Sequence, residues 1–272
     1  MTGEADWVAL AARDSGDHGR PALLLLHGFT GTGSVWAGLT ASLRRKGFRT
    51  IAPDLPGHGR ASSPGPGGAS VERAADDLAR LLAQIGANPA RVLGYSLGAR
   101  IALRLAIAHP ASVSRLVLES PSAGFADAGE RAARREADDA LADEVERDGV
   151  EAFTDRWERN QIFATHALLD PRAAAHQREI RLRNTSAGLA LSLRAAGQGV
   201  MQPLHGRLAE IHVPTLVVAG ALDPVRARAE EVAAGIPGAR LVIVARAGHT
   251  PHLERPAAFR RLVIDFLQED AA

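Results

Sequence analysis

Short apolar runs alternate with amphipathic stretches along most of the 272 residues, and this alternation is the strongest constraint on the fold. Strand-length runs that alternate with helix-length segments are typical of a parallel sheet covered by helices. The expected strands are Val8–Ala12, Leu23–Leu26, Arg49–Ala52, Arg91–Leu93, Arg115–Leu118, Thr215–Ala219 and Leu241–Val244. The expected helices are Val71–Gln84, Leu97–Ala108, Ala227–Ala234 and Pro256–Gln268. The sequence therefore predicts an α/β fold with a mostly parallel central sheet flanked by helices, whose first two strands form an antiparallel hairpin.

The alternation stops between Pro121 and about His212, where no convincing strand is found. The segment is highly charged and helical in pattern, as in GERAARREADDALADEVERDGVEAFTDRWERN. Insertions on the carboxyl side of such a sheet cover the site and shape its pocket. We therefore expect a core of residues 1–120 and 213–272 and a helical cap insertion of residues 121–212.

Composition limits the classes of partner. The 32 Lys and Arg residues nearly cancel the 31 Asp and Glu residues, so we expect neither a nucleic-acid nor a membrane partner. Because the chain has no Cys, it has no disulfide, thiolate metal site or Cys nucleophile. The stretch MTGEADWVAL does not resemble a signal peptide, and no apolar run approaches membrane-spanning length. These features favour a cytoplasmic protein, and they leave its oligomeric state open.

The stretch VLGYSLGARIAL places a serine between two glycines at the end of an apolar run. GxSxG between a strand and a helix is typical of a nucleophile elbow, in which a strained turn exposes the serine hydroxyl. Gly94 and Gly98 supply the space that the turn needs, which makes Ser96 the candidate nucleophile. The alternative is an ordinary glycine-containing turn between a strand and a helix.

A serine hydroxyl needs a histidine to take its proton and a carboxylate to orient that histidine. Asp223 follows the run LVVAG, and His249 follows the run LVIVA, so both lie in loops after strands. The chain order Ser, Asp, His is the one expected for this arrangement, and it predicts the triad Ser96, Asp223 and His249. Asp223 starting a turn and His249 capping a helix are the simpler alternatives. A metal site at His249 and His252 is a weaker one, because no carboxylate cluster lies nearby, and we expect neither metal nor cofactor.

The stretch LLLLHGFTGTGSVW supplies a second loop after a central strand. Backbone N–H groups in such a loop and after the nucleophile stabilise developing oxyanion charge. We predict Phe29 and Leu97 as the two donors. His27 is expected to hold its loop by hydrogen bonds, and His58, in DLPGHGRAS, to pack within its own loop.

The motifs HGFTG, DLPGHG, GYSLG and GHTPHLERP identify the chain as a member of the α/β-hydrolase superfamily, from the first strand to the last helix. Within the superfamily it resembles the 2-succinyl-6-hydroxy-2,4-cyclohexadiene-1-carboxylate synthases, lyases of menaquinone biosynthesis that eliminate pyruvate from their precursor. The narrower resemblance rests on GYSLGAR, ERAARREADD, FTDRWERNQIF and IRLRNTSAGLALSL. After the triad aspartate this chain has Pro-Val-Arg, whereas a Lys-Phe pair is common in those synthases, so a related substrate is also compatible.

The resemblance implies an anionic small-molecule substrate. It implies that Arg100, Arg134 and Arg183 bind substrate carboxylates and that Tyr95 and Trp157 belong to the binding pocket, since planar guanidinium groups pair with carboxylates bidentately. For each arginine the alternative is a solvated helix surface. Arg100 differs, because the helix after an elbow is normally buried and an unpaired charge there is costly.

The resemblance also implies a carbon–oxygen lyase in which Ser96, activated by the other triad members, acts as a base. Two alternatives stay open at this point. One is a serine carboxylesterase or thioesterase that acts on an anionic acyl group, and the other is a binding protein on the same fold without enzymatic activity.

Overall fold

The structure, a computed structural model, describes residues 11–61 and 66–269. Its core is a seven-stranded sheet with the strand order β1-β3-β2-β4-β5-β6-β7. The strands are β1 (Ala12–Asp14), β2 (Ala22–Leu26), β3 (Arg49–Pro53), β4 (Ala90–Tyr95), β5 (Val113–Glu119), β6 (Thr215–Gly220) and β7 (Arg240–Val244). All neighbouring strands are parallel except β1, which runs antiparallel to β3. The prediction of a mostly parallel α/β sheet is confirmed.

The predicted hairpin between the first two strands is wrong. β1 pairs with β3, with Ala12 opposite Pro53 and Asp14 opposite Ile51. β2 lies between β3 and β4, so both of its edges are hydrogen-bonded, and β1 pairs instead with the outer edge of β3. Residues 8–10 of the predicted first strand lie outside the described residues.

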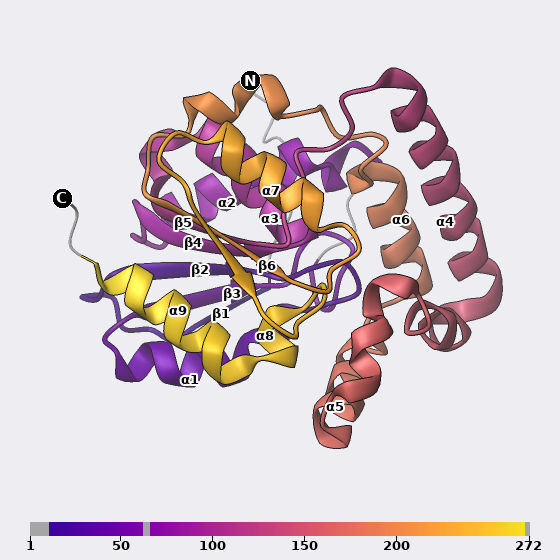
Figure 1. The fold of residues 1–272 in the computed structure, drawn as a ribbon, viewed down its shortest axis with the longest axis horizontal. Coiled ribbons are helices and arrows are strands. Elements are labelled where there is room, and N and C mark those ends of the chain that lie inside the picture. Colours follow the sequence, from indigo (N-terminus) through magenta and orange to yellow (C-terminus); the bar gives the residue numbers. More distant parts are fainter. Residues whose placement is uncertain (1–10, 62–65, 270–272) are drawn as a thin grey trace, which may run out of the picture.

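Helices cover both faces of the sheet (Figure 1). One face carries α2 (Val71–Gln84), α3 (Leu97–Ala108) and α7 (Arg226–Gly235), and the other carries α1 (Ala37–Arg45) and α9 (Pro256–Gln268), which follows the short α8 (Pro251–Glu254). Successive strand side chains point to opposite faces. In β2, Leu24 and Leu26 therefore pack with α2 and α3, whereas Leu23 and Leu25 pack with α1 and α9.

Between β5 and β6 the chain is helical and lies beside the sheet (Figure 1). This part contains α4 (Ala128–Trp157), η4 (Gln161–Leu168), α5 (Pro171–Arg181), α6 (Ser186–Ala196) and η5 (His205–Glu210). α4 and α6 bury a small apolar cluster formed by Ala142, Val145, Phe153, Leu189, Ala190 and Leu193. The segment 121–212 contains no strand, in line with its sequence pattern. Its role as a cap with those boundaries stays a prediction.

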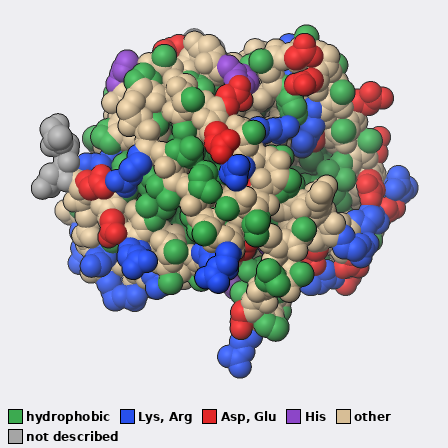
Figure 2. All heavy atoms as spheres, in the orientation of Figure 1, with side chains coloured by type: hydrophobic (Ala, Val, Ile, Leu, Met, Phe, Trp, Pro, Cys, Tyr) green, Lys and Arg blue, Asp and Glu red, His purple; other side chains and the backbone are tan. Residues whose placement is uncertain are grey.

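The face of the protein drawn in Figure 2 shows no single dominant charge. In Figure 2, Lys and Arg side chains are interspersed with Asp and Glu, which agrees with a formal net charge of +1. Across residues 11–61 and 66–269, no helix is both long and apolar enough to cross a lipid bilayer.

Candidate active site

The turn at Ser96 joins β4 to α3 in a strained conformation. Ser96 has φ 50° and ψ −106°, and a non-glycine residue at positive φ persists only where its surroundings enforce it. A Cβ on Gly94 would lie 2.3 Å from the carbonyl oxygen of Gly98, and a Cβ on Gly98 would lie 2.3 Å from that of Leu26. Both contacts are with backbone that cannot move aside, so the two glycines of GYSLG are required for this tight turn.

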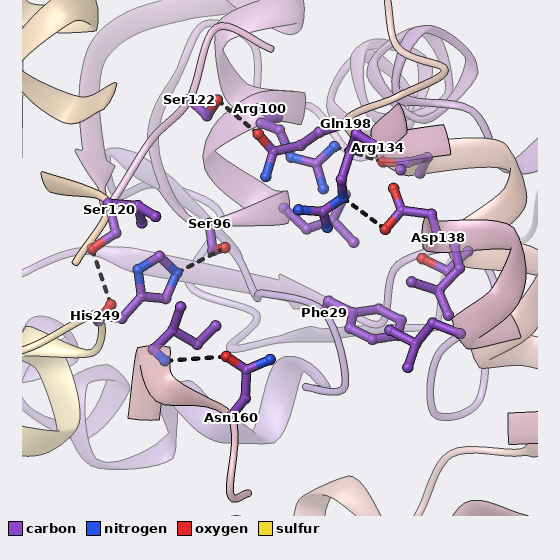
Figure 3. Close-up of a pocket in the computed structure, with 18 of the residues that line it drawn as sticks. Phe29, Ser96, Arg100, Ser120, Ser122, Arg134, Asp138, Asn160, Gln198 and His249 are labelled. Atoms are coloured by element: carbon purple, nitrogen blue, oxygen red, sulfur yellow. Dashed lines mark hydrogen bonds and ion pairs between the residues drawn. The ribbon is translucent and has the colours of Figure 1, made fainter. Parts of the chain in front are cut away.

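Ser96, His249 and Asp223 form one hydrogen-bonded line. His249 Nε2 lies 3.2 Å from Ser96 Oγ, and His249 Nδ1 lies 2.9 Å from Asp223 Oδ2. The two partner residues come from the loops after β6 and β7. The Ser120 hydroxyl also donates to the backbone carbonyl of His249 at 3.0 Å (Figure 3). Since Asp223 accepts the hydrogen on Nδ1, the lone pair of Nε2 faces the serine hydroxyl and is placed to take its proton.

The carboxylate of Asp223 is held in its charged form. Burial by itself raises the pKa of this group, but hydrogen bonds from His249 and from the backbone N–H of Val225 outweigh burial, so the pKa lies below its ordinary value. A charged Asp223 stabilises the imidazolium that forms when His249 takes a proton.

Two backbone segments meet at Ser96 with their N–H groups available. Leu97 is the first residue of α3, so its N–H has no acceptor within the helix, and the positive end of the helix dipole lies at the same point. Phe29 lies in the loop after β2, and both residues line the same cavity as Ser96. Their role as oxyanion donors stays a prediction.

The cavity beside Ser96 and His249 has a volume of about 340 Å³. One part of its wall is aromatic, because the rings of Phe29 and Trp157 meet edge to face at 5.3 Å between centroids. The predicted pocket residue Trp157 is thus brought to the cavity. Polar residues from α3, α4 and α7 form much of the remaining wall.

Arg100 lies in the cavity wall and is only 8% exposed. Its Nη1 donates to the carbonyl of Ala196 at 2.6 Å and lies 3.5 Å from Met201 Sδ. Burial, together with the positive charge of Arg134, lowers the Arg100 pKa to about 10. Among the described residues no carboxylate forms an ion pair with Arg100, so its charge has no anionic partner within the part of the chain that the structure covers.

Arg134 also lines the cavity, on α4, and it has a carboxylate partner. Its Nε donates to Asp138 Oδ1 at 2.9 Å (Figure 3). Burial raises the pKa of Asp138, although the nearby positive charges of Arg134 and Arg100 act in the opposite direction. The ion pair leaves Arg134 with less uncompensated charge than Arg100.

The structure does not place Arg183 in the lining of the cavity, and its carboxylate-binding role stays a prediction. Arg183 is exposed and follows the end of α5, whose buried face carries Gln177, Ile180 and Arg181 at helical spacing. Arg181 donates to Glu158 at 2.8 Å and lies 5.2 Å from the centre of the Phe163 ring. The arginine of this stretch that points inward is therefore Arg181.

Tyr95 precedes Ser96 at the end of β4 and does not line the main cavity. Its ring packs 5.6 Å from that of His249 and 4.8 Å from that of His252, and it borders a small adjacent pocket together with Arg181. Burial raises the pKa of Tyr95 well above its ordinary value, and the negative charge of Glu119 adds to this shift. The structure thus places Tyr95 in support of His249, and substrate contact stays a prediction.

The cavity wall also contains Ser122, Gln198 and Arg228, which the sequence analysis did not single out. The nearest signal was Arg226, in the first turn after Asp223. Arg226, however, pairs with Glu230 at 2.8 Å and does not line the cavity. The position of Arg228 in the first turn of α7, a few residues after Asp223, is the signal that could have identified it.

The other histidines make local contacts. His27 Nε2 accepts the Leu55 N–H at 2.9 Å, which leaves Nδ1 to donate to the Gly28 carbonyl at 2.8 Å, and burial lowers its pKa to about 4. His58 is buried against His27 and bonds the Pro56 carbonyl. Both histidines therefore hold their loops in place.

The metal alternative has no support from side-chain geometry. His252 Nδ1 lies 2.9 Å from Glu119, and neither residue lines the cavity. Within the described ranges, no three or more His, Asp, Glu or Cys side chains come together in a way that suits a metal ion.

Comparisons with known proteins find matches that cover nearly the full chain. A family described as alpha/beta hydrolase fold matches residues 21–256. A protein of Bacillus subtilis (strain 168), provisionally named a 2-succinyl-6-hydroxy-2,4-cyclohexadiene-1-carboxylate synthase, is 38% identical over 265 residues, which cover 97% of this chain and 96% of that protein. A protein of Serratia proteamaculans (strain 568) with the same activity in its name is 30% identical over 261 residues, 96% of this chain and 98% of its own.

A solved structure shows the same arrangement. The structure of MenH from S. aureus has a TM-score of 0.87 and 29% sequence identity, and the match covers 97% of this chain and 98% of that one. The likeness includes both the sheet with its helices and the helical segment between β5 and β6.

Proposed function

This chain belongs to the α/β-hydrolase family and, within it, to the 2-succinyl-6-hydroxy-2,4-cyclohexadiene-1-carboxylate synthases, and we propose that it catalyses their lyase reaction. The reaction eliminates pyruvate from 2-succinyl-5-enolpyruvyl-6-hydroxy-3-cyclohexene-1-carboxylate. The observation that carries this proposal is Arg100, a buried guanidinium without an ion-pair partner among the described residues, in the wall of the cavity that contains Ser96. An anionic substrate supplies the missing negative charge.

Ser96 is the proposed base. As its hydroxyl passes a proton to His249 Nε2, the Ser96 oxygen takes the proton from the ring carbon that carries the succinyl group. The electron pair released there forms a new ring double bond, the existing double bond shifts by one position, and the bond between the ring and the enolpyruvyl oxygen breaks. The leaving enol becomes pyruvate when it takes up the proton held at His249. Every atom of the precursor is then found in the diene or in pyruvate.

The backbone N–H groups of Phe29 and Leu97 stabilise the transition state in this scheme. Loss of the ring proton places negative charge on the adjacent succinyl carbonyl oxygen, and each donor to such an oxygen is worth about 3 kcal/mol. The two N–H groups stabilise the negatively charged oxygen of the transition state more than the neutral carbonyl of the substrate, so they act mainly on the reaction rate.

Arg100 and Arg134 bind substrate carboxylates in this proposal. The precursor carries three carboxylates, and charge-assisted hydrogen bonds to arginine hold such groups in a fixed orientation. Orientation matters here, because the ring proton must lie within reach of Ser96 for the elimination to proceed.

The direct test is pyruvate release from the precursor by the purified protein, followed with a coupled dehydrogenase. We expect steady release by the native protein and none above background from Ser96→Ala. No pyruvate at micromolar native enzyme contradicts the lyase proposal.

A serine carboxylesterase or thioesterase that acts on an anionic acyl group is the second candidate. The observation in its favour is the line from Ser96 to His249 to Asp223, whose 3.2 Å and 2.9 Å distances suit acyl transfer as well as proton abstraction. An acyl group on Ser96, detected by mass spectrometry during turnover, favours this candidate. If no fluorophosphonate labels Ser96, the result favours the remaining alternative, a binding protein without enzymatic activity.

A further inference from the structure

Ser122, Gln198 and Arg228 form a hydrogen-bonded group on the cavity wall, here called the Arg228 cluster. Gln198 Oε1 accepts from Ser122 Oγ at 2.9 Å and from Arg228 Nη1 at 2.8 Å. The three residues come from segments far apart in the sequence, after β5, after α6 and in α7. All three line the cavity that contains Ser96.

The hydrogen bonds fix the direction of the Gln198 amide. Arginine is only a donor, and Ser122 Oγ accepts the Gly124 N–H at 3.1 Å, which leaves its hydroxyl hydrogen for Gln198. The Gln198 carbonyl oxygen must therefore face Ser122 and Arg228, and its NH₂ group must face the other way. Figure 3 shows this nitrogen on the side away from Ser122, toward Ser96. The cluster thus offers N–H donors to the cavity.

The guanidinium of Arg228 is held in place by neutral groups. Its central carbon lies 4.5 Å from the centre of the Phe125 ring, and its Nη1 bonds Gln198. In the part of the chain that the structure describes, no carboxylate makes an ion pair with it. Burial lowers the Arg228 pKa and the charge of Arg134 adds to this, whereas the negative charges of Glu130, Glu231 and Asp223 act in the opposite direction without outweighing burial.

The charges of the cavity wall do not balance. Three arginines line it, Arg100, Arg134 and Arg228, against the single carboxylate of Asp138, which is already paired with Arg134. Among the described residues, Arg100 and Arg228 each hydrogen-bond only uncharged partners, which are carbonyl oxygens and, for Arg100, also the Met201 sulfur. Two guanidinium groups on separate helices, α3 and α7, are thus ready for two separate anionic groups.

We propose that Arg228 and the Gln198 amide form a second carboxylate subsite, distinct from that of Arg100, which determines specificity for a substrate with more than one carboxylate. This inference rests on the proposed function, whose substrate carries three carboxylates. Ser122 acts as a positioning residue, because it holds the Gln198 carbonyl on Arg228 and so directs the amide N–H into the cavity. The subsite holds a group of the substrate that does not react, so its main effect is on binding.

The first experiment measures binding without turnover. Succinate is titrated into the complete protein by calorimetry, with succinamide as the uncharged control. We expect Arg228→Gln to weaken succinate binding by about tenfold or more, the loss that follows from one charge-assisted hydrogen bond. Arg226→Gln is the matched control, because it removes the same charge from the same helix outside the cavity, and it should bind succinate like the parent.

Three outcomes overturn the subsite. They are a native protein that does not bind succinate at millimolar concentration, an Arg228→Gln protein that binds it like the parent, and equal losses in Arg228→Gln and Arg226→Gln. The last result means a general effect of charge rather than a site. A thermal unfolding measurement on each variant checks that the variant is folded before its succinate binding is compared with that of the parent.

The second experiment uses the precursor and pyruvate release. Arg228→Gln should raise KM by about tenfold while kcat changes by less than about threefold, because binding that is equal in the ground and transition states acts on KM. Arg228→Lys should restore part of the loss, since it keeps the charge but not the planar fork. A lower kcat with unchanged KM overturns the binding role. If succinate binding depends on Arg228 but the native protein releases no pyruvate, the subsite stands and the lyase proposal fails.

Discussion

Arg100 provides the sharpest test of whether this cavity is built for an anion, and the perturbation is Arg100→Met. Methionine keeps much of the side-chain length and removes the charge. Burial lowers the Arg100 pKa from its ordinary value to about 10. A shift of this size means that the charged side chain destabilises the folded protein by roughly 3 kcal/mol. Because the folded-state pKa is the lower one, this cost is fully present below about pH 10 and disappears as the pH rises toward the ordinary pKa of arginine.

The substitution also removes the hydrogen bond to the Ala196 carbonyl, which has a length of 2.6 Å. An unsatisfied buried acceptor costs about 1 to 3 kcal/mol, which nearly offsets the gain from removing the charge. We therefore expect the free energy of unfolding of Arg100→Met to change by less than about 2 kcal/mol at neutral pH. Catalytic efficiency should fall by roughly ten- to a hundredfold, because the substrate carboxylate loses a charge-assisted hydrogen bond.

The assay combines urea unfolding of the variant with kcat/KM for pyruvate release. Labelling of Ser96 by a small neutral fluorophosphonate is the internal control and should proceed at the parental rate, since the triad is untouched. Arg100→Lys should recover only part of the efficiency, because an ammonium group cannot form the planar fork. If Arg100→Met unfolds much more readily than the parent but retains full efficiency, Arg100 is a structural residue and the anion-binding argument fails.

The other predictions concern Ser96, the glycine turn around it, Asp223 and Arg183. Ser96→Ala should lower turnover by several orders of magnitude, and adding a substitution of His249 should cost little more, because the triad acts as a unit; near-normal turnover contradicts the assignment. Gly98→Ala should lower stability in thermal or urea unfolding by about 1 to 3 kcal/mol, since the added Cβ would lie 2.3 Å from a backbone oxygen. The lowered pKa of Asp223 contributes stability that is present above its ordinary pKa and is lost as the pH falls through the folded-state value. Asp223→Asn should therefore make the free energy of unfolding depend less on pH on the acid side. A pH dependence equal to that of the parent refutes this. Arg183→Ala should leave KM and kcat within about twofold of the parent, because the side chain is exposed and outside the cavity.

Local patterns in the sequence determined the sheet and the elbow. The Leu23–Leu26 run predicted a strand buried on both faces, and each of these four side chains is fully buried. The glycines at positions 94 and 98 predicted the turn at Ser96, because their requirement is steric and local to the backbone. Placement of Asp223 and His249 at strand ends predicted that they would meet, since the carboxyl ends of parallel strands share one edge of the sheet.

Contacts between segments far apart in the sequence decided the position of β1 in the sheet and the orientation of Arg181. β1 joined β3 because both edges of β2 were occupied, a fact that depends on the order of the whole sheet. Arg181 rather than Arg183 turned inward because α5 packs with the face that carries Gln177 and Ile180, whereas the sequence shows two arginines two residues apart.

The Arg228 cluster shows the same limit most clearly. Ser122 and Gln198 are 76 residues apart, and Arg228 lies 30 residues beyond Gln198. A local pattern shows which residue types are available and which face of an element they occupy. Hydrogen bonds between side chains on separate elements depend on how those elements pack, so only the tertiary structure could bring these three residues to the wall of one cavity.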